Sequence, residues 1–555
     1  MHQMAAMASV LQNPSNGVVR KTAEFAPSYW GDFFISFTSK SDPCTDEREN
    51  KLKEEVKNML LISHSDEPLQ EMELINVIQR LGIGYLFEEQ IDEALKRIHG
   101  VDVIDDDSLH LFSLRFRLLR QAGYNVPSDG FNKFKDEDGK FKEGLINGDA
   151  KGLLSMYEAA YLGILGEAIL DEATAFAREH LKSLVGQVSA SLAKDIELAL
   201  EKPMRRAMVR IRARQYISVY EMDEQRNDVL LELAKLDYNR LQQLHQRELR
   251  DLSVWWKEAG LTHQLSFTRD RIVECYFWAL GTFYEPRYSR GRTMLTKVMM
   301  LTSLLDDIYD AYGTIEEVEP FNHVIQRWDL EALHELPDYM KVYIVALFNT
   351  FNDFEEELRA EGNAYRVEYL REAFKLQSKA YHHEFLWEHN KYVPKFHEHL
   401  QVSAVSCTYP LFYVCSLVGM GDMATKEAFD WVIKVPKIIW SSSLIARLVD
   451  DMYPHKIEQG NDHMPTSVQC YAIEHGLTEE EAVQKISEVL VEDEWKRMNE
   501  ELLKHDQGIP LALYMPAFNL ACVMAEAYKN GDGYNNPEGD MKDNVSMILV
   551  DRVTI

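Results

Sequence analysis

Residues 294–310 read MLTKVMMLTSLLDDIYD, and this stretch decides the fold class of the chain. Its apolar side chains stand at positions 294, 295, 298, 301, 304, 305 and 308, the spacing of one face of an α-helix. The following Tyr312-Gly313-Thr314 supplies a stop signal. The stretch therefore predicts a buried helix whose last turns carry three aspartates.

These aspartates are expected to bind a cation. Side chains four residues apart share a helix face, so Asp306 and Asp310 point the same way while Asp307 is rotated by about 100°. The free carbonyls of the helix end add negative potential. Converging carboxylates suit Mg²⁺, which often shares its ligands with substrate phosphate oxygens. The alternative is a solvated acidic helix end, because Asp and Glu outnumber Lys and Arg by 90 to 60.

A second acidic segment favours the metal site. Residues 448–458 read LVDDMYPHKIE, and Asp450 and Glu458 lie eight residues apart, about two turns along one helix face. Arg447 directly precedes this segment. Two such segments facing each other across a helical bundle can hold metal ions between them. The ligand that these ions share would be a diphosphate.

Basic side chains for a phosphate group are found in Arg269-Asp270-Arg271, just before the aromatic-rich stretch 272–283 that contains Trp278. Planar guanidinium groups bind phosphate oxygens in a bidentate way and stay charged at any relevant pH. The alternatives are a surface charge pair for the arginines and an ordinary core for the aromatic stretch.

The ordered set of motifs resembles that of plant class I terpene synthases, and is most similar to the cytosolic sesquiterpene synthases. The resemblance spans nearly the whole chain. The motifs that carry it are Arg20-Lys21 with Trp30 and Gly31-Asp32, Met156-Tyr157-Glu158-Ala159-Ala160, Arg269-Asp270-Arg271, Asp306 to Asp310, Arg327-Trp328-Asp329, Arg447 to Glu458, and Gly531-Asp532-Gly533-Tyr534.

The resemblance implies three Mg²⁺ ions, for which Mn²⁺ can substitute. Asp306 and Asp310 would bind two of them, and Asp307 would lie in the second coordination shell. Asp450 and Glu458 would bind the third. The implied metal-binding residues are thus Asp306, Asp307, Asp310, Asp450 and Glu458. The implied substrate-binding residues are Arg269, Asp306, Asp310, Arg447 and Asp450.

The resemblance also implies roles in catalysis. Arg269 and Arg447 would receive the departing diphosphate, and Arg271 would support a closing loop. Aromatic side chains would line the cation pocket, with Asp532 beside Tyr528 as a proton acceptor or electrostatic partner. The segment Ser406-Cys407-Thr408 resembles a helix break whose carbonyls face the cation. The full implied catalytic set is Arg269, Arg271, Arg447, Trp278, Tyr409, Tyr528, Asp532 and Tyr534.

Two departures from the family pattern concern the second acidic segment. Pro454 stands where the family has Ser or Thr, so one oxygen ligand is missing. A helical proline also frees the carbonyl four residues back, here that of Asp450. We hypothesise a kink at Pro454, with that carbonyl or a water filling the gap, so Pro454→Ser should preserve or improve Mg²⁺ affinity. Beyond Glu458, residues 459–462 lack the basic side chains of many relatives.

The domain organisation is expected to be all-α with two helical domains, since 555 residues exceed one compact core. Leucines at 233, 236, 241, 244, 249 and 252 form an amphipathic stripe, and no series of alternating strands is visible. By resemblance, residues 1–20 are disordered, residues 21–235 form an N-terminal helical domain without a D-x-D-D motif, and residues 236–555 form the C-terminal catalytic bundle.

Composition excludes some partners. A formal net charge of -30 argues against nucleic-acid and anionic-membrane binding. No uninterrupted apolar stretch is expected to span a bilayer. The six cysteines lack C-x-x-C spacing, which favours reduced thiols. About twenty residues precede Arg20-Lys21 without a Ser- or Arg-rich presequence, so plastid import is not expected. The resemblance implies a cytoplasmic protein, and a monomer is expected.

The resemblance implies a carbon–oxygen lyase that ionises farnesyl diphosphate and cyclises or rearranges the resulting cation. A cytosolic monoterpene synthase that uses geranyl diphosphate would share every motif. A chain-elongating prenyltransferase would need a second D-D-x-x-D, which 450–458 is not. A non-catalytic helical protein with a decayed metal site is the remaining alternative.

Overall fold

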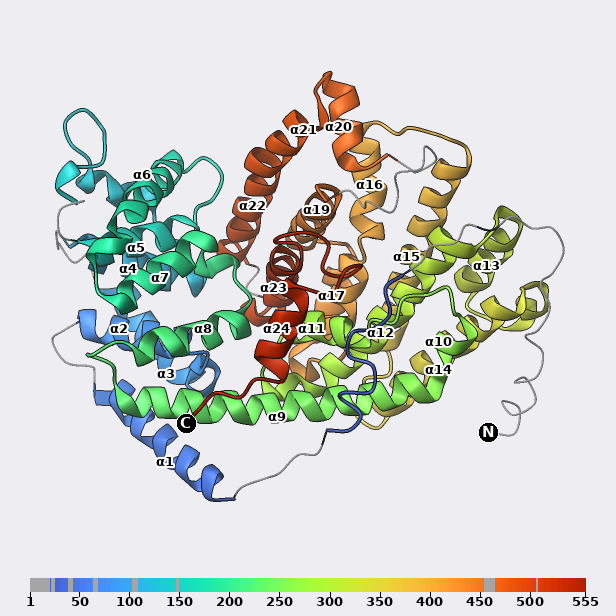
Figure 1. Ribbon diagram of the computed structural model, residues 1–555, viewed down its shortest axis with the longest axis horizontal. Coiled ribbons are helices and arrows are strands. Elements are labelled where there is room, and N and C mark those ends of the chain that lie inside the picture. The colour runs from blue at the N-terminus through green and yellow to red at the C-terminus, as the bar shows by residue number, and fades with distance from the viewer. Residues whose placement is uncertain are drawn as a thin grey trace.

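The computed structural model describes residues 20, 25–37, 43–62, 68–101, 108–145, 149–453, 465–505 and 508–555. Within these ranges the chain is helical, and extended pairing is limited to an isolated bridge between Lys135 and Phe141 (Figure 1). The predicted all-α class is therefore confirmed. Glu458, Pro454, residues 459–462, Lys21 and residues 1–19 lie outside the described residues.

The N-terminal half packs its helices around two apolar clusters. Leu52, Ile75 and Leu118 belong to one cluster, and Phe131 and Tyr157 belong to the other. Its helices are α1 (Pro43–Ile62), α2 (Pro68–Arg80), α3 (Glu88–Gly100), α4 (Leu109–Gln121), α5 (Ala150–Ala160), α6 (Ala168–Leu184), α7 (Ala190–Glu201) and α8 (Val209–Glu221).

The long helix α9 (Asp228–Ala259) joins the two halves, and Figure 1 shows it running beneath both. Its Asn227 cap accepts hydrogen bonds from the backbone of the first turn, and Gly260, with φ 62°, ends it in the left-handed region. The first part of α9, including Leu233, packs in an N-terminal cluster, while Leu249 packs in the C-terminal core. The boundary expected near Lys235 falls inside this helix, and the division into 21–235 and 236–555 stays a prediction.

The C-terminal half is a larger bundle with one continuous core. In it α12 packs against α11 and α17, and α19 packs against α22 and α23. Its helices are α10 (Leu261–Gln264), α11 (Ile272–Thr282), α12 (Ser289–Asp307), α13 (Ile315–Arg327), α14 (Asp338–Arg359), α15 (Arg366–His389), α16 (Phe396–Ser406), α17 (Tyr409–Val418), α18 (Lys426–Val432), α19 (Lys437–Asp451), α20 (Ser467–His475), α21 (Glu479–Lys485), α22 (Glu492–Leu503), α23 (Leu511–Ala527) and α24 (Asp540–Leu549).

The segment 25–37 belongs to the C-terminal half in space, although it comes first in the chain. Trp30 and Phe34 are buried in the C-terminal core, and Lys257 at the end of α9 forms an ion pair with Asp32. The aromatic positions of this segment thus hold the start of the chain against the bundle that carries the acidic motifs.

The expectation that no apolar stretch could span a bilayer is wrong for residues 396–418. Among the described residues, this one stretch is long and apolar enough to cross a membrane by length and composition. It consists of α16 and α17, which are separated by Thr408 with φ 75°. Because 67% of its most apolar window is buried in the bundle, these apolar side chains form protein core.

Candidate active site

Arg269 connects the first acidic motif to the loop before α11. Its guanidinium forms ion pairs with Asp306 and, through Nε at 2.8 Å, with Asp307. Its backbone N–H also donates to Asp307 Oδ2 at 2.8 Å. Burial alone would lower the pKa of Arg269, but these two aspartates raise it well above its ordinary value. Asp307 is 1% exposed, so its carboxylate faces Arg269 rather than solvent.

The turn after α12 is wider than the sequence spacing assumed. The α-helix ends at Asp307, and residues Ile308–Tyr312 form a π-helical turn closed by Gly313 N–H donating to Ile308 O at 2.8 Å. The predicted stop at 312–314 is confirmed, but Asp310 lies on a π turn, a feature often found at functional sites. Burial first, and then the charge of nearby Asp306, raise the pKa of Asp310 well above its ordinary value.

Arg447 holds the second acidic motif within one helix. Its guanidinium forms ion pairs with Asp450 and, at 2.6 Å, with Asp451, three and four residues along α19. Asp451 also accepts the backbone N–H of Ser467 at 2.7 Å, which ties the end of α19 to the start of α20. Although burial lowers the pKa of Arg447, Asp451 and Asp450 raise it well above its usual value.

Glu384 lies between the two motifs, and sequence reasoning missed it. It sits on α15 and accepts the Ser406 hydroxyl at 2.7 Å. Burial raises its pKa to about 7, with a lowering contribution from Arg447 and a raising one from Asp306. Glu384 and Glu388 are four residues apart on one helix, so they share a helix face. This spacing could have identified Glu384 as a candidate site residue.

Aromatic side chains from helices α11 and α17 and from the loop after α23 form the apolar part of the site. Trp278 on α11 makes an edge contact with Tyr534, ring centroids 5.8 Å apart, and Tyr534 donates its hydroxyl to Ser303 at 2.7 Å. Tyr409, at the start of α17, donates to Leu520 O at 2.9 Å. The predicted helix break is confirmed, because α16 ends at Ser406 and α17 begins at Tyr409.

We call the group Trp278, Tyr409 and Tyr534 the aromatic wall. Tyr528 and Asp532 lie at its end, on the side of the second acidic motif. The pKa of Tyr528 is raised well above its usual value, first by burial and then by the charges of Asp450 and Asp532. Asp532 Oδ1 accepts the backbone N–H groups of Tyr534 at 2.8 Å and Asn535 at 2.9 Å. Asp532 therefore lies near Tyr528, as predicted, and its carboxylate stabilises the loop by accepting these backbone N–H groups.

Arg271 fixes this C-terminal loop against the start of the chain. Its buried guanidinium donates to Tyr534 O at 2.8 Å, to Asn535 O at 3.1 Å and to Ala26 O at 2.9 Å. The Phe25 ring lies 5.0 Å from the Arg269 guanidinium. Neither Phe25 nor Asn535 was predicted, since both reach the site only through the tertiary fold.

Arg20 attaches the same N-terminal segment to the π turn. It forms a bidentate ion pair with Glu317 at 2.6 and 2.7 Å and donates to Tyr312 O at 3.0 Å. Its guanidinium lies 4.3 Å from the centre of the Tyr312 ring. The first residue of the Arg20-Lys21 motif thus contacts the turn that carries Asp310.

The donor set fits Mg²⁺ chemically, since carboxylate oxygens such as those of Asp306, Asp310 and Asp450 are hard ligands. In the part of the chain that the structure describes, no three His, Cys, Asp or Glu side chains converge closely enough to hold a metal ion. Arg269 and Arg447 neutralise the carboxylates instead. The predicted ligand Glu458 lies outside the described residues, so the complete ligand set stays a prediction.

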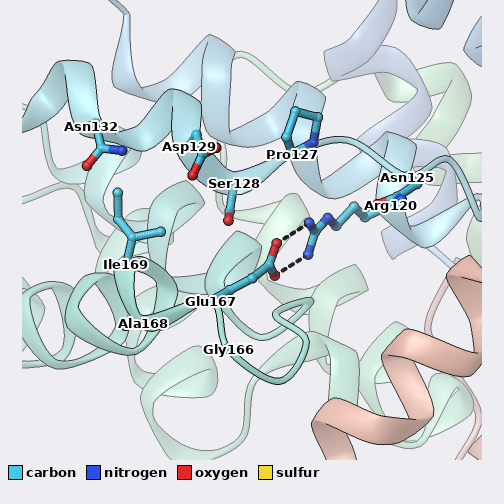
Figure 2. A pocket seen from close by; sticks show the side chains of 10 residues that line it. All are labelled: Arg120, Asn125, Pro127, Ser128, Asp129, Asn132, Gly166, Glu167, Ala168 and Ile169. Atoms are coloured by element: carbon cyan, nitrogen blue, oxygen red, sulfur yellow. Dashed lines mark hydrogen bonds and ion pairs between the residues drawn. The ribbon is translucent and has the colours of Figure 1, made fainter.

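A hollow of about 470 Å³ in the N-terminal half is separate from this site. Figure 2 shows that the Arg120 guanidinium in it is occupied by a bidentate pair with Glu167, at 2.6 and 2.5 Å. Arg120 also donates to Leu162 O at 3.0 Å and Val126 O at 2.8 Å. Its donors therefore stabilise the fold, and none of the predicted site residues lines this hollow.

Comparison with known proteins shows the family of the chain. Residues 29–200 match the model of the terpene synthase N-terminal domain, and residues 257–497 match that of the terpene synthase family metal binding domain. The chain is 44% identical over 548 residues to a (-)-germacrene D synthase of Vitis vinifera, with 98% of each chain covered. It is also 44% identical over 541 residues to an alpha-humulene synthase of Zingiber zerumbet, with 97% of each chain covered.

Solved structures show the same fold. Isoprene synthase from grey poplar, in complex with three Mg²⁺ ions and dimethylallyl-S-thiolodiphosphate, superposes with a TM-score of 0.86 at 36% identity, covering 95% of this chain and 99% of that one. Limonene synthase with 2-fluorolinalyl diphosphate superposes with a TM-score of 0.91 at 31% identity, covering 97% and 100%. The resemblance inferred from the motifs is confirmed, and the chain belongs to the terpene synthase family.

Proposed function

We propose that this protein is a sesquiterpene synthase that ionises farnesyl diphosphate, cyclises or rearranges the resulting carbocation, and releases diphosphate and a C15 terpene. The observation that carries the proposal is that two arginine–aspartate clusters lie near one buried carboxyl, Glu384, whose pKa is raised by burial and also shifted by both Arg447 and Asp306, and that aromatic side chains lie beside them. Arg269 pairs with Asp306, Arg447 pairs with Asp450, and Trp278 contacts Tyr534. The relatives named as germacrene D and humulene synthases support the C15 class.

The two clusters supply what cleavage of an allylic C–O bond needs. Mg²⁺ held by Asp306, Asp310, Asp450 and Glu458 would supply charge that stabilises the leaving diphosphate. Arg269 and Arg447 are already desolvated and fixed in place, so their guanidinium groups can bind the developing negative charge with little reorganisation. Arg271 and the loop that it holds would keep water away from this step.

The aromatic wall would control the carbocation. Faces of Trp278, Tyr409 and Tyr534 can stabilise positive charge without acting as nucleophiles. The hydroxyls of Tyr534 and Tyr409 are held by Ser303 and by the backbone of Leu520, which fixes both rings. Barrier differences of about 1.4 kcal/mol change product branching tenfold, so the shape of this wall would decide the product.

The experiment that tests this function is incubation of the purified protein with farnesyl or geranyl diphosphate, with Mg²⁺ or EDTA. Gas chromatography with mass spectrometry should detect C15 products that require Mg²⁺. C10 products alone would make it a monoterpene synthase. No turnover by demonstrably folded protein across a range of Mg²⁺ concentrations would instead favour a decayed enzyme.

The cellular setting is part of the same proposal. The resemblance supports a cytoplasmic protein that binds prenyl diphosphates, and the net charge of -30 argues against a nucleic-acid partner. We propose that the protein is a monomer. Size-exclusion chromatography with light scattering should give a mass close to that of one chain.

A further inference from the structure

The side chain of Asn535 connects the C-terminal loop to the arginine of the first acidic motif. Arg269 Nη1 donates to Asn535 Oδ1 at 2.9 Å, and Asn535 Nδ2 donates to Asp532 Oδ2 at 2.8 Å. One amide therefore links a carboxylate of the loop to a guanidinium that also pairs with Asp306. None of the sequence motifs includes Asn535.

The contacts of Arg269 are divided among its three nitrogens. Nη2 pairs with Asp306, Nε pairs with Asp307, and Nη1 donates to Asn535. Hydrogen bonds at Nη1 and Nη2, with the ion pair at Nε, restrict the orientation of this planar guanidinium. Two of these partners come from the metal motif, and the third comes from a loop more than 200 residues further along the chain.

The loop itself does not depend on the Asn535 side chain alone. Asp532 caps the backbone of Tyr534, and Arg271 binds the carbonyls of Tyr534 and Asn535. Loss of the Asn535 amide should therefore leave the loop folded while it releases Arg269. This separation makes a positioning role testable apart from a folding role.

A neutral amide is the suitable group at this point. A carboxylate in place of Asn535 would add negative charge where a diphosphate is to bind, and it would face Asp532 as a like charge. An apolar side chain would leave Arg269 Nη1 without this acceptor in a buried position, since Arg269 is 8% exposed. The amide satisfies Asp532 and Arg269 together and adds no charge.

We propose that Asn535 is a positioning residue that orients Arg269 for the diphosphate and couples this orientation to the loop 531–536. The inference rests on the proposed function, because Arg269 is there assigned to the leaving group. Asn535 does not itself react. It fixes the direction in which the guanidinium presents its remaining N–H groups.

The test compares Asn535→Leu and Asn535→Asp with the matched changes Asn536→Leu and Asn536→Asp. Asn536 is the exposed neighbour, and its backbone N–H donates to Asp532 O at 3.1 Å. Loss of a hydrogen bond to a charged group corresponds to a fall of about 10- to 100-fold. We expect this fall in kcat with farnesyl diphosphate for Asn535→Leu, which removes the acceptor of Arg269 Nη1. Asn535→Asp keeps an acceptor but loses the donor to Asp532 and adds negative charge beside it, and we expect a fall of similar size. Both Asn536 variants should change kcat by less than about twofold.

Two further measurements distinguish positioning from a structural role. The dissociation constant of inorganic pyrophosphate with Mg²⁺, measured by calorimetry, should rise about tenfold in Asn535→Leu while the unfolding midpoint stays within about 2 °C of the wild-type value. In an Arg269→Lys background, Asn535→Leu should cost less than twofold, because coupled residues are not additive. A cost that is the same in both backgrounds would overturn the proposal.

Failure of the inference and failure of the proposed function give different results. If the wild type turns over no prenyl diphosphate, the proposed function fails, and pyrophosphate binding still decides the role of Asn535. If the wild type is active and the Asn535 variants match the Asn536 variants in kcat and pyrophosphate binding, the inference is wrong and the function stands.

Discussion

The two arginine–aspartate clusters of the site are built in different ways. Arg447 pairs with Asp450 and Asp451 on its own helix, three and four residues away. Arg269 pairs with Asp306, 37 residues away on another element. The geometry of the second cluster is therefore set by one helix, whereas that of the first requires the loop before α11, the end of α12 and the C-terminal loop to come together.

This difference predicts that the two clusters respond differently to substitution. A local cluster keeps its geometry as long as α19 is helical. A cluster assembled from distant segments can respond to what binds near any of them, because Arg269 also contacts Asn535 and Phe25. We therefore expect the first cluster to be the more sensitive of the two to substitution, both in activity and in Mg²⁺ dependence.

The largest expected effect is that of Asp306→Asn. It removes a predicted ligand of two Mg²⁺ ions and also the charge partner of Arg269, so kcat/KM should fall about 1,000-fold. Asp450→Asn removes a predicted ligand of one ion and should cost about 100-fold. Steady-state kinetics over a Mg²⁺ titration measures both changes.

The matched control for these two variants is Asp422→Asn, which changes an exposed aspartate outside the site. It should alter kcat/KM by less than twofold. If Asp450→Asn proved more damaging than Asp306→Asn at every Mg²⁺ concentration, the proposed division between the clusters would be reversed.

Arg269→Lys and Arg447→Lys are expected to differ from each other in their loss of kcat, and both losses should be smaller than that of Asp306→Asn. A lysine ammonium is a compact charge and cannot serve Asp306, Asp307 and Asn535 in three directions. Arg269→Lys should lower kcat about 100-fold, whereas Arg447→Lys should lower it about tenfold, since a flexible lysine on the same helix still reaches carboxylates three and four residues away. Pre-steady-state release of diphosphate measures the step that is affected.

Arg359→Lys on the exposed surface of α14 serves as the control for these replacements. Equal losses for Arg269→Lys and Arg447→Lys would mean that the tertiary contacts of Arg269 add nothing to its role. The way in which each cluster is built, from one helix or from distant segments, would then have no effect on catalysis.

The sequence predicted what depends on local spacing. Helical periodicity gave the all-α class and the helix that ends near Asp307, and the Gly-containing stop after it is present. The break between Ser406 and Tyr409 was also predicted. These features follow from short-range rules of side-chain periodicity and backbone conformation.

The missed features depend on long-range contacts. Nothing in the spacing of Asn535 or Phe25 relates them to Arg269, because the bundle alone brings these segments together. The π turn at Ile308–Tyr312 is invisible to a pattern that assumes α-helical periodicity. Glu384 had a local signal, the acidic pair with Glu388, but its place between the two clusters is tertiary.

Glu274 is a buried carboxyl that belongs to neither arginine–aspartate cluster, and it shows what such a group does without a paired arginine. It lies on α11 one turn beyond Asp270, is fully buried, and neither of its carboxyl oxygens has a hydrogen-bond partner among the described residues. Burial raises its pKa from 4.5 to about 7. Burial also raises the pKa of Asp307, to about 6, but the ion pair with Arg269 lowers it again in part.

The smallest expected effect on activity, and a measurable one on stability, is that of Glu274→Gln. The native state keeps the proton up to about pH 7 while the unfolded chain loses it near pH 4.5, so the native state binds more protons and wild-type stability falls as pH rises between these values. The pKa difference corresponds to about 3 kcal/mol. Glutamine is neutral at every pH, so Glu274→Gln should become more stable relative to the wild type from pH 4.5 to pH 8, with kcat unchanged within about twofold. Denaturant unfolding at several pH values measures the free energy of unfolding of both proteins, with Glu258→Gln at an exposed position as control. If the stability difference between Glu274→Gln and the wild type did not change with pH, Glu274 would be ionised and neutralised in the native state.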